Sequence, residues 1–262
     1  MHIACCIWAL SGAETDLLRH ACELEFDWID IQPAHLQTLE GRLLAQELGL
    51  RVSCLGATFG MPLNAALDSA DPSTREAAIA HCRAAIEQAG AVSAQVAYVV
   101  PGQDSSAAGL ARYSESLLQL AERAAQEGIK LALEHFPGKA LPTAGETLAY
   151  IEALGHPNLY LLYDSGHILL TGEDPSEVIT AAGARLGYVH FDDNDGMGDL
   201  HWSLLDGVMS EDALDDTIQA LREIDYAGAL SLELSPSLPQ PERALQDSRD
   251  ILLRALHRAA WG

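Results

Sequence analysis

The stretch Leu131-Ala132-Leu133-Glu134-His135 is a short apolar run that ends in a carboxylate and an imidazole. Short apolar runs bounded by Gly, Pro, Asp or Ser are typical of strands buried on both faces of a parallel sheet. This one belongs to the run 129–134, and seven similar runs occur along the chain. They are Ile3–Trp8, Phe26–Ile31, Val52–Ala57, Gln95–Val100, Leu159–Tyr163, Leu186–His190 and Ala229–Leu234.

Longer amphipathic stretches lie between these runs, among them Ser73–Gln88, Leu110–Gln126 and Ser210–Glu223. In the last of these, Ser210 is a predicted helix N-cap, followed by acidic residues that suit the positive end of the helix dipole. Eight βα units in sequence favour an α/β fold of the closed (β/α)8 TIM-barrel type over an open doubly wound sheet. We therefore expect residues 1–262 to form a single TIM-barrel domain. Its weakest unit is 171–183, which leaves room for a short helix.

The composition excludes several classes of protein. Of 262 residues, 48% are apolar, which is enough for a sizeable core, and the formal net charge of −23 disfavours nucleic acid and anionic membranes as partners. No apolar stretch approaches the roughly 20 residues that span a bilayer. The five cysteines are odd in number and form no CxxC motif, which is typical of buried thiols in a reducing compartment. A cytoplasmic protein is the resulting expectation.

Ionisable residues fall at the ends of four consecutive predicted strands. These ends carry Glu134, Asp164, His190 and Glu233. The carboxyl ends of barrel strands converge on one face, where active sites of this fold are built. Because side chains alternate along a strand, Glu134, His190 and Glu233 can each point inward. The alternative is that each residue is a strand-end cap or a surface charge.

Three carboxylates buried together repel one another, which raises their pKa values or destabilises the site. A divalent cation removes this cost. Three carboxylates and one imidazole form an oxygen-rich donor set, which favours Mn²⁺, Mg²⁺ or Co²⁺ over a zinc site of the thiolate type. The sequence therefore predicts one divalent metal ion held by Glu134, Asp164, His190 and Glu233.

The order Glu134, Asp164-x-x-His167, His190 and Glu233 on successive strands resembles the xylose isomerase-like TIM-barrel superfamily. This superfamily includes sugar phosphate isomerases and epimerases, and also endonuclease IV. The ketose 3-epimerase branch implies that the four matching residues hold one divalent metal, for which we expect Mn²⁺ with Mg²⁺ or Co²⁺ as alternatives. It further implies that Glu134 and Glu233 are the acid/base pair, that His167 contacts substrate near the carbonyl, and that a homodimer is one assembly to test.

Two departures from the resembled patterns are visible. Ketose epimerases usually carry an arginine six residues after the strand-seven histidine, where this chain has Gly196. The segment Asp199-Leu200-His201 matches a ligand pair of endonuclease IV, but the histidines of that enzyme's strands three and four have no counterpart here. We therefore expect no trinuclear zinc site, and His201 is predicted to bind substrate or to support the site. Trp8 is predicted either to stack on a sugar or to be an ordinary core aromatic.

A cation that chelates a carbonyl and its neighbouring hydroxyl acidifies the proton on the adjacent carbon. One glutamate then removes this proton, and the cation stabilises the resulting ene-diolate. Return of a proton from the opposite face gives an epimer, and return at the neighbouring carbon gives an isomer. The sequence thus predicts an enzyme of carbohydrate metabolism, a metal-dependent isomerase or epimerase of a small keto sugar or related polyol.

Two other functions remain open at this point. A metal-dependent dehydratase of a keto-polyol, which is a lyase on the same scaffold, begins with the same proton abstraction. A phosphodiesterase similar to endonuclease IV is the other. It is disfavoured by the net charge of −23 and by the scarcity of basic residues near the strand ends.

Overall fold

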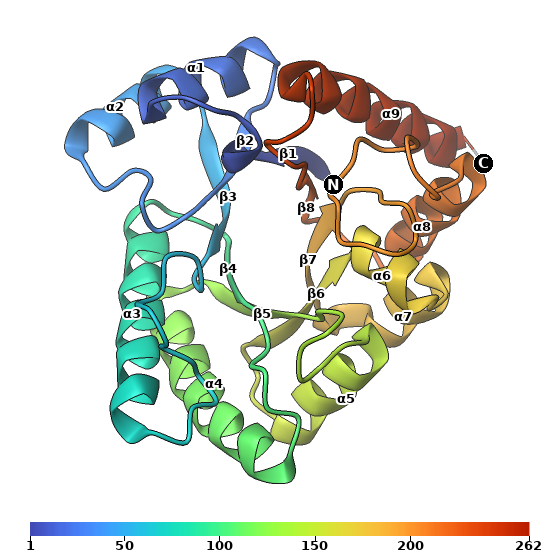
Figure 1. Ribbon diagram of the computed structural model, residues 1–262. Coiled ribbons are helices and arrows are strands. Elements are labelled where there is room, and N and C mark those ends of the chain that lie inside the picture. Colours follow the sequence, from blue (N-terminus) through green and yellow to red (C-terminus); the bar gives the residue numbers. More distant parts are fainter. Residues whose placement is uncertain (262) are drawn as a thin grey trace.

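Eight short strands close into a parallel barrel in the computed structural model, which describes residues 1–261. Each strand pairs with its neighbours in chain order, and β1 pairs with β8 to close the ring (Figure 1). The strands are β1 (His2–Cys6), β2 (Trp28–Ile31), β3 (Arg51–Gly56), β4 (Val96–Val99), β5 (Lys130–Glu134), β6 (Leu159–Asp164), β7 (Leu186–Phe191) and β8 (Ala229–Leu232). The predicted (β/α)8 TIM barrel is confirmed.

Helices surround the barrel on its outside (Figure 1). They are α1 (Glu14–Glu23), α2 (Leu39–Glu47), α3 (Pro72–Ala91), α4 (Ala107–Glu127), α5 (Ala144–Leu154), α6 (Ser165–Thr171), α7 (Pro175–Ala182), α8 (Glu211–Glu223) and α9 (Pro241–Trp261), with 3-10 turns η1 (Ile7–Ala9) and η2 (Gly183–Arg185). As predicted, Ser210 caps α8, because its hydroxyl accepts a hydrogen bond from the backbone N–H of Ala213. The first predicted strand is too long, since the chain turns into η1 after Cys6 and places Trp8 there.

Alternation along the strands divides the apolar residues into two layers. In β5, Leu131 and Leu133 belong to the large core between the sheet and the helices. Ala132 belongs instead to a small cluster inside the barrel, together with Leu162 and Tyr188. Because strand side chains repeat every two residues, Glu134, Asp164 and His190 also face the interior, each two positions further toward the carboxyl end.

The strand register brings two of these polar residues side by side. Asp164 of β6 is paired with His190 of β7, and a register shift between Leu161 and Leu162 precedes this pair. A second shift, between Ile29 and Asp30, occurs where β2 meets β3. Such irregularities re-aim the side chains that follow them, and both occur next to buried polar residues.

The structure also bears on the expectations about membrane spans and about the cysteines. Within residues 1–261, no helix combines the length and the apolar character needed to cross a membrane. All five cysteines are free thiols, and Cys5, Cys6, Cys54 and Cys82 are buried.

We expect Leu131→Ala to lower the free energy of unfolding by about 2–5 kcal/mol, because it leaves a cavity in the layer between barrel and helices. Leu43→Ala, at an α2 position that is 54% exposed, is the matched control and should change it by less than about 0.5 kcal/mol. Urea unfolding followed by circular dichroism measures both. Equal losses in the two variants would contradict the assignment of this layer as the core.

Candidate functional site

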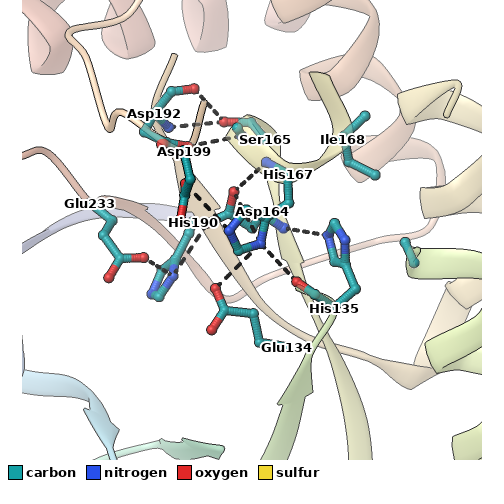
Figure 2. A network of polar contacts seen from close by, with 12 residues as sticks. Glu134, His135, Asp164, Ser165, His167, Ile168, His190, Asp192, Asp199 and Glu233 are labelled. Atoms are coloured by element: carbon teal, nitrogen blue, oxygen red, sulfur yellow. Dashed lines mark hydrogen bonds and ion pairs between the residues drawn. The ribbon is translucent and has the colours of Figure 1, made fainter. Parts of the chain in front are cut away.

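Four polar side chains meet at the carboxyl end of the barrel. Glu134 and Asp164 are the last residues of β5 and β6, His190 is the penultimate residue of β7, and Glu233 directly follows β8. One ligand atom from each lies within 4.8 Å of the others, and all four residues are buried. Figure 2 shows Glu134 and Glu233 on either side of His190 and Asp164. These residues, which we call the four-residue centre, are the set predicted from the sequence to hold a metal.

His190 is the link between the carboxylates of this centre. Its Nδ1 lies 2.7 Å from Oε2 of Glu233 and 3.8 Å from Oδ2 of Asp164. The rings of Tyr98 and Tyr188 lie against it at 5.2 and 5.5 Å between centroids, both nearly perpendicular to the imidazole plane. The tyrosines therefore restrict rotation of the imidazole, and Nδ1 stays directed at the carboxylates.

Three buried atoms of the centre have no hydrogen-bond partner. Oδ2 of Asp164 and Nδ1 of His190 are two of them, and Nδ1 lies close to Glu233 without the geometry of a hydrogen bond; Nε2 of His190, on the other side of the ring, is a third. Buried polar atoms are nearly always paired, since an unpaired one costs about 1–3 kcal/mol. Oδ2 of Asp164 and Nδ1 of His190 face the same point as the two glutamates, so the centre has the donor atoms that a cation requires.

Asp164 is held by groups on both sides of it. Its Oδ1 accepts a hydrogen bond of 2.8 Å from the backbone N–H of His167, which makes it the N-cap of α6. Its own backbone N–H donates to Nε2 of His135 at 3.2 Å. His135 therefore helps to hold the backbone of β6 in place at Asp164.

The carboxylates of the centre differ in their protonation. Burial raises the pKa of Glu134 to about 8, with His167 opposing the shift and Glu233 adding to it. Burial alone would also raise the pKa of Glu233, but the adjacent His190 lowers it to about 2. Burial lowers the pKa of the His190 imidazole, yet Glu233 raises it well above its usual value. His190 and Glu233 thus form an ion pair, and Glu134 faces Nδ1 of His167 at 3.7 Å, which does not offset the effect of burial on the pKa of Glu134.

A second polar group lies beside this centre and involves the residues predicted to bind substrate. Nε2 of His201 lies 3.3 Å from Oδ1 of Asp199, and Nδ1 lies 2.9 Å from Oδ2 of Asp192. Nε2 of His167 lies 3.5 Å from the same oxygen of Asp199, and its Nδ1 lies 2.7 Å from the carbonyl oxygen of His135. Asp199 therefore connects the two histidines.

The loop between β7 and α8 is less solvated than its polar sequence suggests. Asp192, Asp193 and Asn194 are all completely buried. Asp192 accepts a hydrogen bond of 2.8 Å from the backbone N–H of Gly166, and the Asn194 amide donates to the Gly166 carbonyl at 2.9 Å. These side chains fasten the loop to the start of α6, and so they fix the positions of His167 and His201.

A cavity of about 430 Å³ opens beside the four-residue centre. Its wall includes Glu134 and Glu233 but neither Asp164 nor His190, which lie deeper. Two larger cavities lie elsewhere, both lined by residues from the amino-terminal ends of strands, away from this chemistry. The remaining wall residues are Trp8, Thr58, Phe59, Met61, Tyr98, Val100, Phe136, Asp199, His201, Leu234, Ser235 and Pro236.

The predicted substrate contacts differ in how they meet this cavity. Trp8 and His201 are part of its wall, and Trp8 packs against Phe59 at 5.2 Å between ring centroids. His167 is 1% exposed and lies behind Asp199 rather than in the wall. Tyr98 and Asp30 are polar neighbours of His190 that sequence reasoning missed. For Asp30, the available signal was an acidic residue inside the apolar run 26–31.

The chain is similar to known proteins both in sequence and in fold. A family model described as xylose isomerase-like TIM barrel matches residues 18–256. An L-ribulose 3-epimerase of Mesorhizobium japonicum is 28% identical over 250 residues, which is 87% of this chain and 78% of the relative. An inosose dehydratase of Clostridium perfringens is 34% identical over 80 residues, which is 30% of this chain and 27% of the relative. The crystal structure of a D-allulose 3-epimerase from Methylomonas sp. has the same fold, with a TM-score of 0.81 at 22% identity, and covers 99% of this chain and 98% of that one.

We expect Gly166→Ala to lower the free energy of unfolding by about 1–3 kcal/mol, because an added Cβ would lie 2.5 Å from Oδ1 of Asp192. Gly145→Ala in α5 is the matched control, since its Cβ would find no heavy atom closer than 3.5 Å. The control should change stability by less than about 0.5 kcal/mol. Thermal and urea unfolding measure both variants. A Gly166 variant as stable as its control would show that the loop is not fastened at this point.

Proposed function

This chain belongs to the xylose isomerase-like TIM barrel family, and within it we propose that the protein is a divalent-cation-dependent epimerase of a small keto sugar. One observation carries the proposal. Of the four residues of the centre, the two glutamates also line the cavity, whereas Asp164 and His190 lie behind it. Glu134 and Glu233 can therefore reach both a cation and a substrate.

The donor set supports one divalent cation at the four-residue centre. Three carboxylates and one imidazole suit Mn²⁺ first, with Mg²⁺ or Co²⁺ as alternatives, and the unpaired Oδ2 of Asp164 and Nδ1 of His190 face the required position. Its positive charge offsets the mutual repulsion of the buried carboxylates. When bound, such a cation polarises a substrate carbonyl and acidifies the neighbouring carbon–hydrogen bond.

In the proposed reaction one glutamate acts as the base and the other as the acid. One carboxylate takes the proton from the carbon next to the carbonyl, and the other, in its protonated form, gives a proton to the same carbon from the opposite face. The net result is inversion at that carbon with no change in mass. Asp164 and His190 have no access to the cavity, so their role is to hold the centre together.

The wall of the cavity favours a neutral polyhydroxylated substrate. It carries the carboxylates of Glu134, Asp199 and Glu233, and its residues include no Lys or Arg. A phosphorylated or carboxylated substrate would meet repulsion from these carboxylates without a Lys or Arg side chain to offset it. Trp8, Phe59 and Phe136 provide apolar surface for the carbon–hydrogen face of a sugar, while His201 and Asp199 supply polar atoms for hydroxyl groups.

The relatives support this assignment and also a second candidate. The Mesorhizobium japonicum relative is an L-ribulose 3-epimerase and aligns with most of this chain. The shorter alignment with an inosose dehydratase favours a lyase as the second candidate, since both reactions start with loss of the proton next to a carbonyl. Incubation with keto sugars and with cyclic keto-polyols separates the two, because epimerisation conserves mass and dehydration releases water.

We expect Glu233→Gln to lower kcat on a keto sugar such as L-ribulose by at least about 100-fold, because it removes one of the two proton-transfer groups. Glu152→Gln on the exposed face of α5 is the matched control and should retain full activity. In D₂O, the wild-type product should gain deuterium at the carbon next to the carbonyl. Near-wild-type turnover in the Glu233 variant, with its fold and cation content intact, would refute the assignment.

We also expect activity to depend on a bound cation, since the substrate carbonyl needs a positive partner. Treatment with a chelator followed by desalting should lower the epimerisation rate by at least about 100-fold. Addition of Mn²⁺ should restore it, with about one ion bound per chain by metal analysis. Full activity in protein shown to be free of metal would contradict this part of the proposal.

A further inference from the structure

A carboxylate lies inside the barrel beneath the four-residue centre. Asp30, on β2, is completely buried and follows the register shift between β2 and β3. Its Oδ1 accepts a hydrogen bond of 2.6 Å from the hydroxyl of Tyr188, and its Oδ2 accepts one of 2.7 Å from the hydroxyl of Ser231. Neither donor carries a positive charge, although a buried carboxylate is costly without one.

The imidazole of His190 also faces Asp30. Oδ2 of Asp30 lies 3.5 Å from Nε2 of His190, a buried nitrogen that makes no hydrogen bond, while Nδ1 of the same ring faces Glu233 and Asp164. The two ring nitrogens therefore point to different carboxylate environments. One points into the four-residue centre, and the other points down into the barrel.

This arrangement matters because a neutral imidazole carries one proton and one free lone pair. Whichever nitrogen holds the proton cannot bind a cation, and the hydrogen bond made by the other ring nitrogen decides between the two forms. A carboxylate accepts hydrogen bonds but cannot donate one when ionised. Beside Asp30, the proton is stabilised on Nε2, which leaves the lone pair of Nδ1 directed at the centre.

We propose that Asp30 is a positioning residue, which holds the proton on Nε2 of His190 and so presents Nδ1 to the cation of the four-residue centre. The inference rests on the proposed function, because it concerns the cation that this function requires. Carboxylates that orient a ligating histidine in this way typically strengthen metal binding by about 10–100-fold.

The surroundings of Asp30 support this role. The phenol oxygen of Tyr188 also lies 2.8 Å from the hydroxyl of Ser53 on β3, which can donate to it, so a third strand helps to hold the tyrosine in place. The Tyr188 ring packs against His190 at 5.5 Å between centroids. The carboxylate and the imidazole are thus oriented by the same tyrosine, which leaves little freedom for either to turn away.

Asp30→Asn is the decisive variant, because it keeps the shape of the side chain but removes its charge. We expect its affinity for Mn²⁺, measured by calorimetry, to fall by about 10–100-fold. Asp216→Asn, at an exposed position of α8, is the matched control. It makes the same change of side chain away from the centre, so its affinity should stay within about 3-fold of the wild type. Equal affinity in the wild type and the Asp30 variant would overturn the role.

A spectroscopic readout keeps the inference testable if the Asp30 variant fails to fold. Wild-type protein labelled with ¹⁵N-histidine and loaded with diamagnetic Zn²⁺ should show the His190 proton on Nε2, with assignment from a His190→Gln sample. A proton on Nδ1 would overturn the inference.

The outcomes separate this inference from the proposed function. Wild-type protein that binds no Mn²⁺ contradicts the proposed function and, with it, the role of Asp30. Wild-type protein that binds Mn²⁺ no better than a folded Asp30→Asn variant contradicts the role of Asp30 alone.

Discussion

Three carboxylates and one imidazole are held within 4.8 Å of one another at the end of the barrel, where all four residues are shielded from water. In such surroundings like charges repel strongly, and the imidazoles of His190 and His167, which face these carboxylates, offset the repulsion only in part. Burial raises the pKa of Glu134 to about 8, and repulsion from Glu233 adds to the shift. A cation held by the four residues would offset the same repulsion.

The barrel holds these charged side chains close together because the backbone of each strand sets the direction of its side chains. Strand alternation directs Glu134, Asp164 and His190 inward, two positions beyond small or apolar interior residues. Beneath them, Tyr188 and Ser231 satisfy Asp30, which in turn faces the imidazole. The site is therefore a column of polar residues that rises through the barrel interior and ends at the cavity.

The sequence was sufficient for the barrel and for the four-residue centre because both depend on local patterns. Each strand is a short apolar run, and Glu134 or Asp164 stands where its own run ends. The rest depends on contacts between distant segments. Asp30 lies 158 and 201 positions from the donors that satisfy it, and the burial of Asp192 and Asn194 comes from their contacts with Gly166. No local pattern reveals such pairings, and so neither the partners of Asp30 nor the burial of the β7–α8 loop follows from the sequence.

The central claim is that the four-residue centre holds one divalent cation. Anomalous diffraction from crystals soaked in Mn²⁺ tests it most directly. The account predicts one strong peak about 2.2 Å from oxygen or nitrogen atoms of Glu134, Asp164, His190 and Glu233. The absence of a peak there, or a peak confined to the neighbouring group Asp192, Asp199 and His201, would contradict it.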